Sequence, residues 1–242
     1  DFGETIEEIY VSMSTPYQLD PDDAENTLYK QYQPDVQSAF HTLNYAKQYP
    51  QTIKEEQLRQ AFLSMNGVTD LISKITQAMY TGMEYDEFIT MKYMLAKIAL
   101  NGKIAPIGIP LINKDNMLDI VSIIKETSGN LTYMSPSYNM AHVQNLSAVS
   151  EQYIILSNKF DSKMTVQVLA SAFNMDKADF VGQRVGVDSF GKVDQARLAI
   201  LFAKDKQYIP LSEVELAQLD AIPAMILDKE FFMMFDNLLT MR

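Results

Sequence analysis

The 242-residue sequence contains no cysteine and only two histidines. Without cysteine, neither a disulfide framework nor a thiolate metal site can form. His41 and His142 stand far apart along the chain, the first in an extended aromatic segment and the second in a polar loop. Two distant histidines are too few for a histidine-based triad or metal cluster to be expected. We expect each histidine to have a structural role.

Positive charge and long apolar runs are also scarce. The chain has 20 Lys and Arg residues against 31 Asp and Glu residues, which gives a net charge of −11. Such a chain offers no basic stripe to a phosphate backbone, so sequence-specific nucleic-acid binding is not expected. No apolar run approaches the length of a membrane span, so we expect no membrane insertion. Hydrophobic residues still make up 47% of the chain, enough for one large domain or two smaller ones.

The abundant carboxylates do not form a catalytic or metal-binding motif. Residues 188–194 (DSFGKVD) place two aspartates around a glycine but lack the alternating ligands and distal Glu of a calcium loop, so a plain turn is predicted. Residues 20–23 and 55–56 suit helix starts, where acidic side chains are favoured. Residues 101–103 (NGK) lack the spacing of a phosphate-binding loop and predict a helix stop. We therefore predict no catalytic residue, no cofactor site and no metal ligand.

The first hundred residues predict helices interrupted by one extended segment. Spaced aromatic and aliphatic residues at 40–53 indicate a strand, with a proline at its end or edge. Thr52 and Glu55 fit a capping box for a short helix that follows. Apolar residues at helical spacing over 68–98 predict one long helix bent near Gly82, or two helices in succession, packed on the 40–53 segment.

From residue 104 onward the pattern changes to alternating strands and helices. Helical spacing predicts one helix from Met117 to Ile124, ended by Gly129, and another around residues 168–173. Strands are predicted from apolar runs at residues 104–112, 153–156, 184–187, 198–203, 224–227 and 231–235. Such alternation is typical of a sheet with helices packed on it, so the chain divides near residue 103 into a helix-rich part and an α/β part.

Several blocks of sequence stand out because of their order along the chain. They are residues 3–10 (GETIEEIY), 40–53 (FHTLNYAKQYPQTI) with 58–62 (LRQAF), 85–95 (YDEFITMKYML), 166–182 (VQVLASAFNMDKADFVG) and 224–238 (AMILDKEFFMMFDNL). In this order they resemble the major capsid protein of small tailed bacteriophages of the phi-29 kind. The blocks are spread over nearly the whole chain, the last two are the most specific, and none is a catalytic signature.

The resemblance implies an α+β protein with the HK-97-type phage capsid fold, in which a peripheral (P) domain with a long spine helix accompanies an α/β axial (A) domain. On this interpretation residues 1–15 end the strand of the E-loop, residues 16–103 form the P domain and residues 104–242 form the A domain. The implied function is that of a structural major capsid (head) protein, not an enzyme. Its copies would self-assemble into an icosahedral or prolate shell around a double-stranded DNA genome, with residues 131–150 nearest the capsomer centre.

The partners implied by the resemblance are other copies of the chain in hexameric and pentameric capsomers, a scaffolding protein and the portal vertex. The implied location is the virion, after assembly in the bacterial host cytoplasm. Two alternatives stay open. One is a shell protein of a cellular compartment with the same fold, or another phage structural protein. The other is a carboxylate-based hydrolase.

The two ends of the sequence lead to a further expectation. The chain begins at Asp1 and ends within a few residues of the apolar run at 231–235, whereas loose ends are usually polar. We therefore expect a core cut from a longer capsid subunit, without the N-terminal arm, most of the E-loop and the returning P-domain strand. Such a core is expected to fold but to be monomeric or weakly associated.

Overall fold

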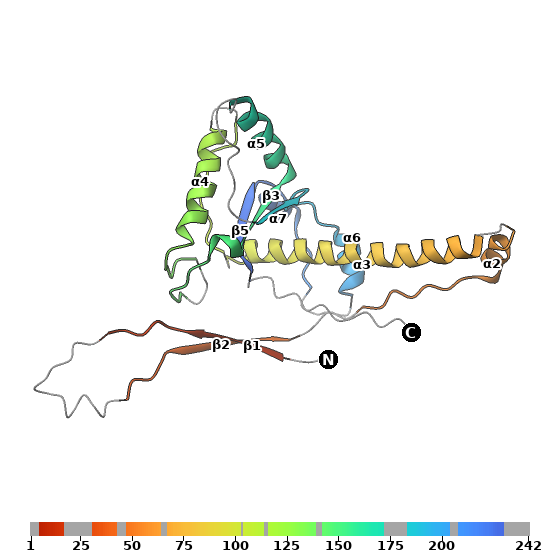
Figure 1. Ribbon diagram of the computed structural model, residues 1–242, viewed down its shortest axis with the longest axis horizontal. Coiled ribbons are helices and arrows are strands. Elements are labelled where there is room, and N and C mark those ends of the chain that lie inside the picture. The colour runs from red at the N-terminus through yellow and green to blue at the C-terminus, as the bar shows by residue number, and fades with distance from the viewer. Residues whose placement is uncertain are drawn as a thin grey trace, which may run out of the picture. The chain divides into compact units, whose positions relative to one another are not determined.

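The computed structural model describes residues 5–16, 31–42, 47–63, 67–102, 104–113, 116–138, 142–171, 183–203 and 208–229. The chain forms two compact units, and it enters each of them more than once. Unit 1 takes residues 1–44, 102–188 and 223–242, and unit 2 takes residues 45–101 and 189–222. Helices and strands are mixed along the chain, as expected for an α+β protein (Figure 1).

Two strands near the start of the chain form an antiparallel ribbon. Strand β1 (Thr5–Val11) pairs with β2 (Val36–Thr42), and the register places Val11 opposite Val36 (Figure 1). Beyond this pair, the Ser12 N–H donates to the Asp35 carbonyl and the Ser12 hydroxyl donates to the Asp35 carboxylate, both at 2.9 Å. The bounds predicted for strand β2, 40–53, are therefore wrong. The observed strand ends at Thr42, and residues 47–54 have no regular structure. Pro50 in that segment has no N–H to give to a ladder.

The long helix predicted in the first half is one continuous helix, α3 (Gly67–Leu100), in unit 2. Gly82 lies inside it, and the chain turns at Gly102, whose φ of 64° lies in the left-handed region that favours glycine. Helix α2 (Glu55–Ala61) precedes it. The predicted Thr52–Glu55 cap is wrong, because the chain stays extended through Lys54, whose N–H donates to the Gln57 side chain at 3.1 Å.

Helix α3 is buried only along its C-terminal half. Its buried residues are Asp86, Ile89, Lys92, Leu95, Ala96 and Ile98. Ile89 forms a core with Leu198 and Leu201 of helix α6 (Gln195–Leu201), and aromatic residues 93, 202 and 208 pack around it. The predicted strand at 198–203 is therefore wrong. An apolar run this short can form a strand or a helix. Here Asp194 favours the helix as its N-cap, because its carboxylate accepts the Arg197 N–H at 3.0 Å.

Unit 2 also contains helix α7 (Glu213–Asp220), which begins with a capping box. The Ser212 hydroxyl accepts the Glu215 N–H at 3.3 Å, and the Ser212 N–H donates to the Glu215 carboxylate at 2.7 Å. Gly191 lies directly against this helix. A Cβ built at Gly191 would stand 2.3 Å from the Leu216 carbonyl oxygen, so only glycine fits there without a shift of the backbone.

The α/β part of unit 1 is built on a three-stranded sheet. Its central strand β3 (Gln152–Ser157) is parallel to β4 (Gln183–Val187) and antiparallel to β5 (Ala224–Asp228). Helices α4 (Met117–Asn130) and α5 (Asn158–Ser171) pack with the sheet (Figure 1). Their shared core consists of Met117, Ile120, Val121, Ile124, Ile154, Leu156, Phe160 and Met164.

The predicted helix at 117–124 and the predicted strands at 153–156, 184–187 and 224–227 are confirmed. The strand predicted at 104–112 is wrong, since this segment has no regular structure. Its two prolines remove ladder donors, and its isoleucines Ile109 and Ile112 pack on the core without strand pairing. The predicted helix around 168–173 is confirmed as far as Ser171. The strand predicted at 231–235 and the helix start at 20–23 lie outside the described residues.

Candidate interaction surfaces

The residues considered for chemistry are placed in separate parts of the chain. Within the described residues, no group of three or more His, Cys, Asp or Glu side chains is arranged to hold a metal ion. His41 lies in β2, and His142 is exposed in a segment without regular structure, at a φ of 51°. Glu55 and Glu56 form the first turn of α2. None of the described helices is both long enough and apolar enough to cross a bilayer.

The 188–194 segment connects β4 to α6, and its polar groups are engaged in structural bonds. The Ser189 hydroxyl donates to Asp220 at the end of α7. Asp194 caps α6 and also accepts the Tyr85 hydroxyl at 2.9 Å. The Arg197 N–H, followed by the Tyr85 hydroxyl, holds the pKa of Asp194 below its ordinary value. Ser189 and Asp194, near the two ends of the segment, therefore have structural roles.

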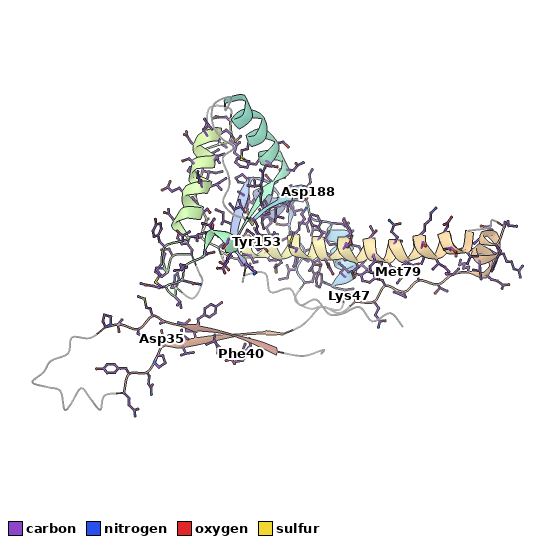
Figure 2. The ribbon with its side chains drawn as sticks, viewed as in Figure 1. Asp35, Phe40, Lys47, Met79, Tyr153 and Asp188 are labelled. Atoms are coloured by element: carbon purple, nitrogen blue, oxygen red, sulfur yellow. The ribbon has the colours of Figure 1, made fainter. Side chains whose placement is uncertain are left out.

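The ribbon has one apolar face that is open to solvent. Residues directly opposite each other share a face, so Val11 with Val36, Ile9 with Ser38 and Glu7 with Phe40 lie on the same side. The four apolar side chains of this face are between 51% and 66% exposed, and Figure 2 labels Phe40 among them. A two-stranded ribbon with such a face is marginal in water, so this face is suited to burial against another surface.

Residues 1–44, which include the ribbon, also carry most of the net negative charge of the chain. Residues 1–44 contain nine Asp and Glu residues against a single Lys and no Arg. Residues 1–44 should repel nucleic acid, and the same segments of two copies should repel each other. Their charge therefore favours a neutral or basic surface elsewhere on a partner.

A second candidate surface lies after α4 and is uncharged. From Thr127 to Ser150 the chain contains no Asp, Glu, Lys or Arg. Within this run, residues 131–147 are called here the neutral loop. Its described residues, 131–138 and 142–147, are not helical, and two backbone hydrogen bonds of 3.0 and 3.3 Å join Ser135 to Asn145. Tyr133, Met134 and Leu146 are exposed on it. Simple counting of charges would have found this run in the sequence.

Gln152 holds both ends of the neutral loop. Its side chain is fully buried, and its amide donates to the carbonyls of Ser128 and Ser147 at 3.1 and 3.0 Å. It accepts the Ser128 hydroxyl at 2.5 Å in return. The Ser147 hydroxyl donates to Asp228 of β5, and the Ser147 N–H donates to the Leu131 carbonyl at 2.8 Å. The loop is therefore fixed to α4, β3 and β5 at its base.

A third candidate surface is the N-terminal half of α3. A shallow hollow of about 560 Å³ lies along it, lined by Ile72, Ser73, Thr76, Gln77, Tyr80, Thr81 and Glu84. Ile72 and Tyr80 are exposed there. A mixed apolar and hydroxyl-bearing face of this kind is suited to a protein partner more than to a small molecule.

The boundary between the exposed and the buried half of α3 is marked by an ionic cluster. The Asp86 carboxylate is fully buried and accepts Arg197 Nε at 2.7 Å and Arg197 Nη2 at 2.9 Å. It also accepts the Tyr49 hydroxyl at 2.9 Å. The hydrogen bond to Asp86 raises the pKa of Arg197. Local sequence patterns could not reveal this cluster, because its three members come from distant parts of the chain.

Comparison with known sequences gives one consistent result. A model of the family described as Phi29-like phage major capsid protein matches residues 1–242. The major capsid protein of Bacillus phage PZA is 28% identical over 240 residues, which cover 98% of this chain and 48% of that protein. The major capsid protein of Bacillus phage GA-1 is 26% identical over 246 residues, which cover 100% of this chain and 46% of that protein. The chain thus spans about half the length of these relatives.

Comparison with solved structures agrees at the level of fold. A chain in the capsid structure of Staphylococcus phage Andhra matches 93% of this chain, with a TM-score of 0.60 and 14% identity, over 65% of its own length. A chain in the structure of head fiber and inner core protein gp22 of native bacteriophage P68 matches 94% of this chain. Its TM-score is 0.62 at 17% identity, over 66% of its own length.

Proposed function

This chain belongs to the Phi29-like phage major capsid protein family, and from that premise we propose that it builds the head shell of a tailed phage. The observation that carries the proposal is the family match over all 242 residues, which the fold similarity to a phage capsid chain supports. On this proposal many copies associate into a closed icosahedral or prolate shell around double-stranded DNA, in the virion, after assembly in the host cytoplasm.

We propose the HK-97-type arrangement for its parts. Helix α3, with its 34 residues, is the candidate spine helix of a P domain at residues 16–103. The segment 1–15 contains β1 and is the candidate E-loop strand, and residues 104–242, with the three-stranded sheet, are the candidate A domain. The ribbon then supplies a contact between copies, because its apolar face needs a covering surface.

The neutral loop is proposed to lie nearest the capsomer centre. Around a symmetry axis each residue meets its own counterparts from the other copies, so one charge there is repeated in every copy and repels itself. A chain with a net charge of −11 meets this requirement with a run of residues that lacks Asp, Glu, Lys and Arg. The exposed Tyr133 and Met134 provide apolar contact area there.

The work of such a subunit is association without a chemical step. We propose no catalytic residue, no cofactor and no metal, and the relatives named above are all major capsid proteins. The proposed partners are further copies in hexameric and pentameric capsomers, a scaffolding protein and the portal vertex. Standard protein contacts bury about 1,200–2,000 Å², and repetition of such contacts closes a shell.

The proposal is tested by expressing the gene's complete open reading frame in bacteria, alone and together with the phage's scaffolding protein. We expect closed particles of regular size in electron micrographs of the lysate fraction that sediments faster than free subunits. A folded product that remains monomeric with and without the scaffolding protein would contradict the proposal. A shell that encloses host proteins and forms without any phage component would favour a cellular compartment.

A further inference from the structure

The segment between the ribbon and α2, residues 47–54, lies on unit 2 and is called here the strap. Its side chains are exposed except for Tyr49, which is half-buried. The Tyr49 hydroxyl donates to the Asp86 carboxylate at 2.9 Å. The ammonium of Lys47, a residue labelled in Figure 2, donates to the Leu201 carbonyl at the end of α6. It lies 5.7 Å from the centre of the Phe202 ring. The strap is thus attached to both α3 and α6 through side chains.

The attachment at Tyr49 can be released without leaving a buried charge unpaired. Arg197 satisfies both oxygens of Asp86 by itself, with bonds of 2.7 and 2.9 Å. Loss of the Tyr49 hydroxyl therefore removes one hydrogen bond to a charged group and leaves the ion pair in place. Loss of Arg197 would have the opposite effect, since the buried Asp86 carboxyl group would lose its charged partner. The packing of α3 on α6 therefore depends on the Asp86–Arg197 pair, whereas the attachment of the strap depends on the Tyr49 hydroxyl.

We propose that the strap is a releasable anchor for the chain that leads from β2 into unit 2, and that Tyr49 is the positioning residue that holds the strap on α3. The ribbon ends at Thr42, shortly before Lys47, so the strap decides where the chain from β2 reaches unit 2. When the strap is bound to α3 and α6, the chain from β2 joins unit 2 at Lys47 and Tyr49. When the strap is released, this junction moves to the start of α2 at Glu55. Residues 47–54 then add up to about 25 Å of reach, at roughly 3.3 Å for each extended residue.

The inference rests on the proposed function, in which the ribbon contacts other copies. In a shell built from both hexameric and pentameric capsomers, as proposed above, chemically identical copies have to make the same contact in more than one geometric environment. A ribbon whose base has two attachment points can reach partners at two distances without any change in its own structure. Local opening of an exposed segment with little buried surface needs much less free energy than global unfolding.

The test compares two matched variants of the 242-residue chain. Tyr49→Phe removes the hydroxyl that holds the strap. Tyr85→Phe removes a bond of the same kind and length, from Tyr85 to Asp194, which does not involve the strap. We expect Tyr49→Phe to accelerate tryptic cleavage after Lys47 about tenfold, because cleavage follows the open population and one hydrogen bond to a charged group is lost. Tyr85→Phe should cleave there at the wild-type rate.

Amide hydrogen exchange provides a second measurement on the same variants. Peptides from residues 47–54 should exchange faster in Tyr49→Phe, while peptides from α3 and α6 keep the wild-type rate. Equal rates at the strap in both variants and in the wild type would overturn the proposal. So would accelerated exchange throughout unit 2 in Tyr49→Phe, since Tyr49 would then support the core and not the strap.

The link to assembly is measured with the complete open reading frame. Tyr49→Phe should broaden the distribution of particle sizes in electron micrographs, and Tyr85→Phe should leave it unchanged. An unchanged distribution in Tyr49→Phe would overturn the positioning role of Tyr49. Failure of the unmodified protein to form any shell would count against the proposed function, whereas the cleavage and exchange results judge the strap by themselves.

Discussion

Asp86 of α3 and Arg197 of α6 form a two-pronged ion pair, at 2.7 and 2.9 Å, in which the carboxylate is completely buried. Two parallel N–H donors from one guanidinium fix the relative orientation of the two helices more closely than a single contact could. The pair joins residues 111 positions apart in the sequence.

The first prediction concerns this pair. Arg197→Met should lower the free energy of unfolding by about 2–4 kcal/mol, because a buried carboxylate loses its charged partner. Arg59→Met is the control, since the Arg59–Glu55 pair on α2 is 77% exposed on both sides and should contribute less than about 1 kcal/mol. Urea denaturation measures both. Equal losses in the two variants would show that burial of Asp86 does not strengthen its pair.

The second prediction concerns the close approach at Gly191. Gly191→Ala should destabilise the chain by roughly 1–3 kcal/mol, because the added Cβ would stand 2.3 Å from the Leu216 carbonyl oxygen and 2.8 Å from the Asp220 nitrogen. Gly129→Ala is the control: it lies in α4, where the Cβ would meet no described atom within 4 Å, and it should stabilise by about 0.5–1 kcal/mol. The sign of the change in melting temperature distinguishes the two.

The third prediction concerns acid. The Ser212 N–H and then its hydroxyl hold the pKa of Glu215 below its ordinary value, as the Arg197 N–H does for Asp194. A folded-state pKa below the unfolded value means that the unfolded chain binds more protons as the pH falls. The stabilisation is therefore present above about pH 4–5 and is lost as the pH falls through the lowered values. Denaturant titrations from pH 6 to pH 2 should show a shallower loss in the double variant Asp194→Asn/Glu215→Gln than in the wild type.

The fourth prediction concerns the base of the neutral loop. Gln152→Met keeps the side-chain volume but leaves the Ser128 and Ser147 carbonyls without the amide donor, so it should cost about 1–3 kcal/mol. Amide exchange should accelerate first in residues 131–147. Exchange that rises equally in all parts of unit 1 would show that Gln152 supports the sheet as a whole and not the loop.

The fifth prediction concerns contact between like loops. If the neutral loop lies at the capsomer centre, as proposed, every copy of a charged variant adds the same charge near one axis. Met134→Asp and Met134→Lys, each in the complete open reading frame, should then each reduce shell yield strongly. Co-expression of the two variants should restore the yield, since opposite charges then meet. Ser122→Asp and Ser122→Lys on the exposed side of α4 are the controls and should assemble normally. A mixture that assembles no better than either variant alone would place the neutral loop away from such an axis.

The sequence by itself was sufficient for the elements whose signal is local. The stripe from Met117 to Ile124 and the short apolar runs of β3 and β5 were predicted to within a residue or two, because period and burial agree there. The length of α3 followed from its spacing, although its continuity through Gly82 did not. Family membership also came from sequence, since the order of several blocks carries more information than any one of them.

The tertiary structure decided everything that depends on a distant partner. Residues 198–203 were predicted to be a strand, which is wrong. The Asp194 cap and the packing of Leu198 and Leu201 on Ile89 make residues 195–201 a helix. Strand β2 begins at Val36 and not at Phe40 because its register is set by β1, which is remote in sequence. The bonds of Asp86 to Arg197 and Tyr49 are invisible to any short-range pattern for the same reason. Local propensity acts over a few residues, whereas the partners that satisfy a buried charge or complete a strand pair are brought together only when the whole chain folds.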